Sequence, residues 1–234
     1  MRRGSARRGE QMAKAMKQGL IARKRGMSQV FGDDGNVTPV TVLEAGPCTV
    51  VQLKTRARDG YEALQLGFEP KRKNVSKPLA GHFKKANLVP SRVLREVRVE
   101  SLEGYQVGQT LTVDLFKPGD LVDVSGVTKG QGFQGGIKRH GWSGGEASHG
   151  SMFHRAPGSI GASSDPSRVF PGHRLPGRMG AARVTVPHLE VVRVVPEQHL
   201  LVVRGAVPGA TGGLVVIRKS VKLSKAQQRA AKKA

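Results

Sequence analysis

The stretch Lys117-Pro-Gly-Asp-Leu-Val-Asp-Val-Ser-Gly-Val127 joins a turn signal to a predicted β-strand that begins at Leu121. The next strand-like runs, Val184–Val186 and Leu189–Val195, begin only after a long interval. Loops without secondary structure of their own rarely exceed roughly 12 to 15 residues in compact domains, and those that do are usually functional or disordered. We therefore treat residues 126–183 as a functional insertion and call it the extension.

The sequence on either side of the extension predicts β structure. Apolar and polar residues alternate at Glu96–Glu100 and at Thr110–Leu115, where Leu111, Val113 and Leu115 would share one face. A short helix is expected near His82–Asn87. Further strand-like runs are Val40–Ala45, Thr49–Lys54, Glu62–Phe68, Leu200–Val203 and Leu214–Arg218. Many short strands separated by Gly and Pro turns predict a mainly β (α+β) fold, either a barrel or a sandwich.

The composition indicates a polyanion as the partner. The chain has 39 Lys and Arg against 17 Asp and Glu, a net charge of +22, and nucleic acid is the commonest polyanion. No apolar run approaches the roughly 18 to 20 residues that span a bilayer, and no secretory signal is evident, so we expect a soluble intracellular protein. The single cysteine, Cys48, excludes an internal disulfide and a multi-cysteine zinc site. Because it lies in a strand-like run, we expect a small core residue rather than a nucleophile.

The extension concentrates glycine and positive charge. It holds fourteen glycines, eight Lys or Arg, four of the seven histidines and only two acids, Glu146 and Asp165. Residues 70–92 form a second basic segment without an acid. Glycines let backbone N–H groups approach phosphates, and the cations pair with them. Our candidate RNA-binding residues are Lys129, Gly130, Gly132, Lys138, Arg139, His140, Trp142, His149, His154, Arg155, Arg168, His173, Arg174, Arg178 and Arg183 in the extension, and Lys71, Arg72, Lys73, Lys84 and Lys85 in the second segment.

Two enzymatic interpretations of the extension fail on context. Gly130–Gly135 has the GxGxxG spacing, but the sequence after it shows no helical period and no acid follows about 20 residues on, as a dinucleotide site requires. Ser148, His149, His154 and Asp165 include nucleophile, base and acid types, yet nothing in the sequence brings them together. No phosphate-binding loop of the NTPase type and no metal-ligand spacing occurs, so we predict no catalytic residue, cofactor or metal.

Aromatic residues are scarce in the chain but recur in the extension. Phe133, Trp142, Phe153 and Phe170 are interleaved with lysine and arginine. Flat rings beside cations suit stacking on bases and pairing with phosphates. The same rings would equally suit a miniature core in which the extension folds on itself, and both interpretations stay open.

Specific strings resemble one family. Gly126-Val-Thr-Lys-Gly-Gln-Gly-Phe-Gln-Gly135 in the extension closely resembles bacterial-type large-subunit ribosomal protein number three. The further matching strings are Gly26–Phe31, Pro39–Val42, Ala45–Cys48, Lys138–Gly141, Ala147–Gly150, His154–Gly161, Arg178–Gly180 and Arg204–Gly209, where many family members have lysine at the position of Arg204. The match runs in order over about residues 19–221.

The resemblance implies a closed β-barrel like that of translation elongation factors, a small appended region and a long extension that penetrates large-subunit ribosomal RNA. It assigns residues 19–125 and 184–221 to the barrel with the appended basic region 70–92, and 126–183 to the extension. The basic composition of residues 1–18 and 222–234 indicates two tails. The resemblance also implies an early assembly protein of the cytoplasmic ribosome that does no chemistry. Its partners would be rRNA and neighbouring ribosomal proteins, with no membrane and no small-molecule substrate. About Lys138–Arg155 would lie nearest the peptidyl-transferase centre.

Two departures from the family pattern limit what is carried over. Many members have a methylated glutamine after the Gly-Ser-Ile-Gly string, whereas this chain has Ala162, so we predict no such modification. Residues 1–18 precede the usual family start and are an RNA-binding tail, an organellar targeting peptide or an overlong gene start. The rival hypotheses are a general nucleic-acid-binding or RNA-chaperone protein and, on the GxGxxG spacing alone, a nucleotide-dependent oxidoreductase.

Overall fold

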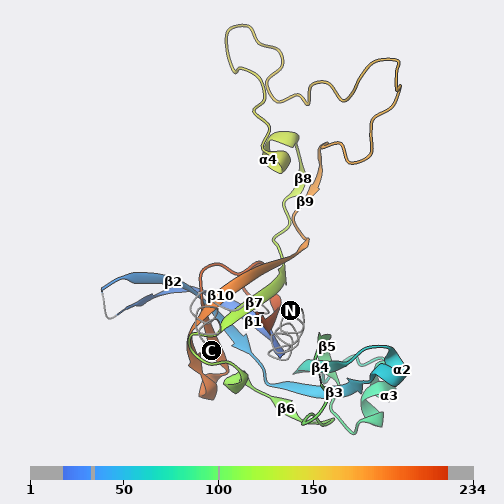
Figure 1. Ribbon diagram of the computed structural model, residues 1–234, viewed down its shortest axis with the longest axis vertical. Coiled ribbons are helices and arrows are strands. Elements are labelled where there is room, and N and C mark those ends of the chain that lie inside the picture. Colours follow the sequence, from blue (N-terminus) through green and yellow to red (C-terminus); the bar gives the residue numbers. More distant parts are fainter. Residues whose placement is uncertain (1–17, 33–34, 100, 221–234) are drawn as a thin grey trace, which may run out of the picture. The chain divides into compact units, whose positions relative to one another are not determined.

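The computed structural model describes residues 18–32, 35–99 and 101–220 (Figure 1). The basic tails expected at residues 1–18 and 222–234 lie outside these ranges, apart from Gln18. The chain divides into two compact units. One is Thr128–Ala182, and the other is the remainder of the chain, made of Met1–Val127 and Arg183–Ala234.

Six antiparallel strands form a closed barrel in the larger unit, in the order β1-β12-β7-β10-β11-β2. The strands are β1 (Gly19–Phe31), β2 (Val37–Ala45), β7 (Leu121–Val127), β10 (Arg183–Val195), β11 (Leu200–Arg204) and β12 (Leu214–Lys219). A 3₁₀ turn, η2 (Pro196–Gln198), joins β10 to β11. The predicted mainly β fold with a closed barrel is confirmed.

The barrel forms because apolar residues alternate along its strands and meet inside. Leu20, Leu43, Val122, Leu201 and Ile217 are all fully buried. Strand β1 pairs with β12, so that Leu20 lies opposite Ile217, and β1 then continues into a hairpin with β2. Closure pairs each barrel strand on both sides over its barrel part, which removes there the usual site of edge-to-edge aggregation.

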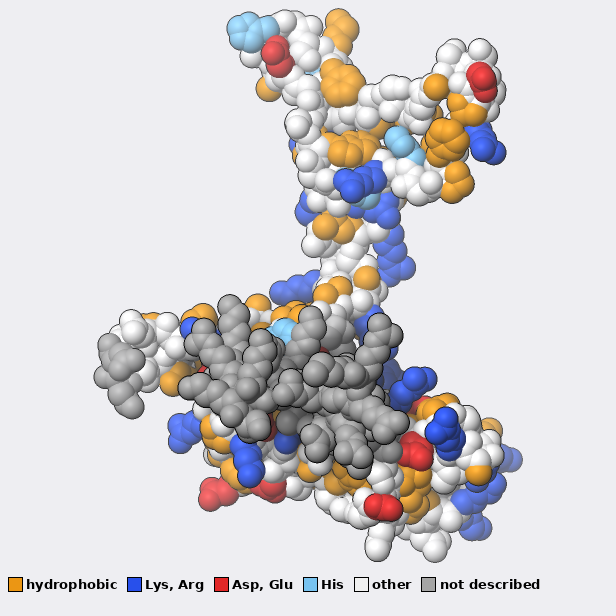
Figure 2. Space-filling view, viewed as in Figure 1, with side chains coloured by type: hydrophobic (Ala, Val, Ile, Leu, Met, Phe, Trp, Pro, Cys, Tyr) orange, Lys and Arg blue, Asp and Glu red, His pale blue; other side chains and the backbone are white. Residues whose placement is uncertain are grey.

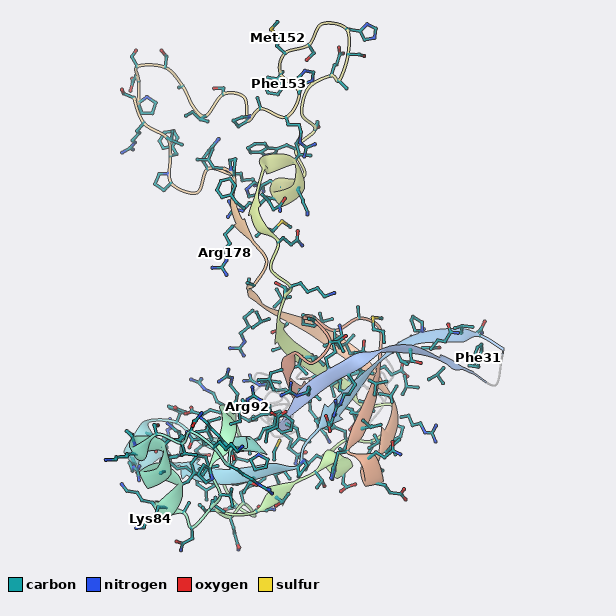
Figure 3. All side chains as sticks on the ribbon, turned by 180° about the vertical axis from the view of Figure 1, so that it is seen from behind. Phe31, Lys84, Arg92, Met152, Phe153 and Arg178 are labelled. Carbon is teal, nitrogen blue, oxygen red and sulfur yellow. The ribbon has the colours of Figure 1, made fainter. Side chains whose placement is uncertain are left out.

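The β1–β2 hairpin extends beyond the barrel strands that flank it. At its end, the Gly32 N–H donates to the Asn36 carbonyl at 2.9 Å. Met27, Phe31 and Val37 are exposed near its end, and Phe31 is labelled there in Figure 3. An exposed apolar hairpin end of this kind is a surface suited to a partner.

A four-stranded antiparallel sheet with the order β5-β4-β3-β6 packs beside the barrel. Its elements are β3 (Cys48–Lys54), α2 (Arg56–Asp59), β4 (Ala63–Pro70), α3 (Lys77–Lys85), β5 (Ser91–Arg98) and β6 (Thr110–Leu111). The appended region is therefore larger than residues 70–92, because Cys48–Lys54 and Ala63–Pro70 pair with each other rather than with barrel strands. Cys48 is fully buried in one hydrophobic core that both sheets share, as the sequence predicted.

Two expectations about local structure are wrong. Of the strand predicted at Thr110–Leu115, only Thr110–Leu111 forms a strand, β6. A 3₁₀ turn, η1 (Val113–Leu115), follows it. The Thr112 hydroxyl donates to the Asp114 carboxylate at 2.5 Å, a local bond that competes with strand pairing, and Val113 is buried without continuing the alternation. Helix α3 begins at Lys77 instead of near His82, because Pro78 in its first turn has a backbone angle preset for a helix.

The smaller unit, Thr128–Ala182, consists mainly of irregular backbone. A two-stranded ribbon pairs β8 (Gly132–Gln134) with β9 (Gly177–Met179), and helix α4 (Gly136–His140) follows β8 directly (Figure 1). Most of its side chains are exposed. No helix in the described ranges is long and apolar enough to cross a membrane.

Candidate nucleic-acid interface

The base of the extension is a narrow pair of strands. Arg183 lies opposite Val127 at the end of the β7–β10 pairing. Just beyond, Thr128 N–H donates to the Ala182 carbonyl at 2.9 Å, and Ala182 N–H donates to the Thr128 hydroxyl at 3.3 Å. The smaller unit therefore begins and ends at two hydrogen-bonded neighbours.

The β8–β9 ribbon carries exposed cations. Phe133 lies opposite Arg178, and both side chains are exposed; Arg178 is labelled in Figure 3. Lys129 is also exposed, and the glycine pair Gly130 and Gly132 leaves the backbone beside it uncovered. A bare backbone between cations fits phosphate contacts by N–H groups and side chains together.

Helix α4 corrects one expectation. The sequence after Gly130–Gly135 showed no helical period, yet a five-residue helix begins there. It forms because of contacts made outside it: Arg139 and His140 both bond the Leu175 carbonyl, at 2.6 and 3.0 Å. The dinucleotide interpretation still fails, since β8 pairs antiparallel with β9 in a two-stranded ribbon and not within a parallel β-α-β unit.

Trp142 packs directly against the backbone of α4. A Cβ atom on Gly136 would overlap the Trp142 indole, so the close approach depends on glycine. The His140 and Trp142 ring centroids lie 5.9 Å apart with the planes at 33°. Trp142 therefore serves the miniature core, whereas Phe133, which is 77% exposed, does not. The miniature-core interpretation therefore holds for Trp142, and stacking on bases stays a prediction for the exposed Phe133.

The structure brings five of the candidate residues together. Arg139 and His140 bond the irregular segment that precedes β9, and Trp142, His173 and Arg174 line one cavity of about 440 Å³ with Pro157, Ser159 and Gly172. Flat rings, an arginine and open space of this size suit a stacked base and its phosphate. These residues come from both arms of the extension, which explains why no short motif revealed the cavity.

The remaining extension candidates are spread along exposed loop. Arg168 lies over the Phe170 ring at 5.5 Å, and Lys138 and Arg155 are exposed. His149 and His154 also lie on this exposed loop, near the labelled Met152 and Phe153 in Figure 3. Among the described residues, no hydrogen bond links Ser148, His149, His154 and Asp165 to one another. The same residues contain no cluster of side chains that could bind a metal. The space-filling view shows blue and orange side chains along this unit (Figure 2).

The second basic segment forms a separate surface on the four-stranded sheet. Phe83 is buried and anchors α3, so that Lys84 and Lys85 in the last turn point to solvent. Arg72 and Lys73 are exposed and Lys71 is half-buried, its N–H bound to the Pro90 carbonyl at 2.7 Å. Lysine and arginine side chains gather over the part of this sheet that carries α2 and α3 (Figure 2). This surface belongs to the larger unit, whereas the cavity around Trp142 belongs to the smaller one.

Sequence reasoning missed three arginines on strands. Arg218 on β12 lies near Arg183 on β10 and Arg98 on β5, and Arg95, Arg183 and Arg218 line one cleft. The signal available was the alternation of Glu96–Glu100, which places Arg98 on the face opposite the buried Val97. Which sheet would lie across from that face was not legible from the sequence.

Comparisons with known proteins agree with these features. Residues 96–198 match the family model described as Ribosomal protein L3. The chain is 57% identical over 208 residues to the large ribosomal subunit protein uL3 of Carboxydothermus hydrogenoformans, covering 88% of this chain and 99% of that protein. The uL3 proteins of Pelotomaculum thermopropionicum and Desulforudis audaxviator are 57% and 56% identical, over 99% and 97% of their lengths. With near-complete coverage at this identity, the chain belongs to the ribosomal protein L3 family.

Proposed function

We propose that this protein is a structural component of the large ribosomal subunit that binds rRNA early in assembly and sends its extension towards the peptidyl-transferase centre. The observation that carries the proposal is the extension itself. Residues Thr128–Ala182 hold seven Lys or Arg and two acids, with most side chains exposed and rings such as Phe133 uncovered. A segment with so little core of its own gains order by neutralising its charge on RNA and stacking on bases.

The named partners follow from this placement. We assign the two basic surfaces, the extension and residues 70–92, to rRNA. The exposed apolar end of the β1–β2 hairpin, where Met27 and Phe31 lie, suits contact with neighbouring ribosomal proteins. The protein acts in the ribosome of the cytoplasm. As a ribosomal protein L3 it is not an enzyme, in agreement with the prediction.

The test is sedimentation of a lysate that carries the tagged chain. We expect comigration with large subunits that survives high salt, which strips loosely bound basic proteins, and that is lost on RNase treatment. A chain that stays at the top of the gradient, or retains DNA after RNase treatment, would instead be a general nucleic-acid binder or RNA chaperone. Comigration with organellar ribosomes alone would move the site of action to an organelle.

Trp142→Ala should impair the catalytic step of the ribosome more than assembly. Without the indole that packs against Gly136, helix α4 loses its support. The cavity lined by Trp142, His173 and Arg174 loses one of its walls. A displacement of about 1 Å near a catalytic centre costs up to about 100-fold in rate. We expect slower peptide-bond formation or an altered response to antibiotics of that centre, with full occupancy of the protein in subunits. His140→Ala, which also loses the bond to Leu175, should act in the same direction.

The control for Trp142→Ala is Val107→Ala, which removes an exposed apolar side chain from a loop outside the extension. Peptide-bond formation and drug profiles should be normal in the control. Normal elongation in the Trp142→Ala ribosomes, at full occupancy, would contradict the placement of this part of the extension.

A further inference from the structure

A cleft of about 670 Å³ lies between the outer face of the barrel and the four-stranded sheet, within the larger compact unit. Strands β7, β10 and β12 contribute one wall, and β4 and β5 the other. Ligand sites commonly measure roughly 300 to 1,000 Å³, so the cleft has room for a nucleotide. None of the candidates named from the sequence except Arg183 belongs to it.

Positive charge dominates this cleft. Arg95 on β5, Arg183 on β10 and Arg218 on β12 line it. The one acid among its described lining residues is Glu96, whose carboxylate accepts a hydrogen bond from the Tyr61 hydroxyl at 2.7 Å and pairs with Lys54 at 3.0 Å. Because Lys54 balances the Glu96 charge, the three guanidinium groups are left in excess.

Arg218 is the central member of the cluster. Its Nε atom is buried and has no hydrogen-bond partner among the described residues. Burial lowers the pKa of Arg218, and the nearby Arg183 and Arg98 lower it further, while Asp123 acts in the opposite direction. A buried donor without a partner and a crowd of like charges are both costly, and a bound anion would relieve both.

We propose that this arginine cleft, defined by Arg95, Arg183 and Arg218, binds a phosphate of the rRNA backbone together with its nucleotide. The guanidinium fork matches phosphate geometry, and one phosphate can accept from two arginines at once. Leu94 and Val216, which also line the cleft, offer apolar contact to the sugar or base. The inference rests on the proposed function, because it names a site for the same RNA on the rigid strands of the protein.

The first test measures how the affinity of the full-length chain for deproteinised large-subunit rRNA varies with salt. Arg218→Gln and Arg183→Gln should each weaken binding about 5- to 10-fold at 0.1 M salt and reduce the log-log salt slope by about one. The double variant should lose about twice that slope. Arg193→Gln is the matched control, since it removes the same charge from an exposed position of β10, outside the cleft. Thermal unfolding within a few degrees of the parent shows that the variants fold.

The second test places a thiol in the cleft by Val216→Cys. Cys48 gives little background because it is fully buried and its pKa is raised to about 11, mainly by that burial, which leaves almost no thiolate at neutral pH. Iodoacetamide should label the new thiol at least tenfold more slowly when rRNA is bound. A thiol placed by Gln106→Cys, in an exposed loop outside the cleft, is the control.

The outcomes separate the two claims. If the parent chain binds rRNA but the arginine variants keep its salt slope and the thiol at position 216 is not protected, the cleft inference is overturned and the proposed function stands. If the parent chain does not bind rRNA, the proposed function itself fails. Protection by large-subunit proteins in place of naked rRNA would assign the cleft to an acidic protein segment and also overturn the inference.

Discussion

Replacing residues 129–181 by an Asn-Gly turn is expected to leave the barrel folded while rRNA affinity falls by at least about 1,000-fold at 0.1 M salt. The replacement is possible because Thr128 and Ala182 are hydrogen-bonded neighbours at the base of the extension. An Asn-Gly pair forms the two-residue turn that joins antiparallel strands. Strands β7 and β10 would then connect as an ordinary hairpin of the barrel.

The size of the expected loss comes from counterion release. The deleted segment holds seven Lys or Arg and two acids. If each cation neutralises one phosphate, the log-log slope of affinity against salt falls by about five to six. The measurement is rRNA binding across a salt series, with circular dichroism and thermal unfolding to confirm the barrel.

The chain offers a control of matched charge. Residues 1–17 hold six Lys or Arg and one acid, so they have the same net charge of +5 as residues 129–181. Their deletion should cost far less affinity, because the extension adds the glycine-lined ribbon and the Trp142 cavity to its charge. Equal losses from the two deletions would show that net charge alone holds the RNA, and loss of the barrel fold would show that the extension is not separable.

Gly180→Ala should weaken rRNA binding at least tenfold more than Gly150→Ala. Gly180 has a φ of 74°, and an added Cβ would collide with the Lys129 carbonyl oxygen and lie 3.0 Å from Gln131 N. These are backbone atoms at the start of the β8–β9 ribbon, so no side-chain rotation relieves the collision. The ribbon has to open, and the Gln131 N–H then loses its 2.9 Å bond to the Met179 carbonyl.

Gly150→Ala separates collision from backbone strain. Gly150 also has a positive φ, 72°, but nothing lies within 4 Å of a Cβ placed there. Its substitution should cost only the left-handed backbone term, about 1 to 2 kcal/mol. Affinity is measured by titration of rRNA at fixed salt, and barrel stability should not change in either variant. Equal affinities for the two variants would mean that the ribbon is not needed in the bound state.

The sequence predicted the strands of the barrel well because period-two alternation follows directly from burying one face of a strand, whereas the closed barrel was what the family resemblance implied. Leu214–Arg218 and Leu200–Val203, predicted as strands, lie within β12 and β11. It failed at Val113–Leu115, where a bond from Thr112 to Asp114 favours a local turn over continued pairing. Alternation of apolar and polar residues describes one strand at a time and contains no information on a competing local hydrogen bond.

The candidate interface was legible only in part. Glycine content, charge and interleaved rings identified the extension, because they are properties of composition. Helix α4 was missed since Arg139 and His140 stabilise it through Leu175, more than 30 residues along the chain. Arg218 was missed for a related reason: its role depends on the sheet that lies opposite it, which no local pattern records.

The pairing of β1 with β12 determines the order in which parts of the fold can form during synthesis. Gly19 and Arg218 are partners, so the barrel stays open until nearly all of the described chain has been synthesised. Pairing of residues so distant in sequence is slow to form. Synthesis of the extension ends at Arg183, before β11 and β12 are made. At that stage the extension is therefore a cationic segment attached to an unclosed sheet. Under the proposed function, rRNA would bind the extension at that stage, before the fold is complete.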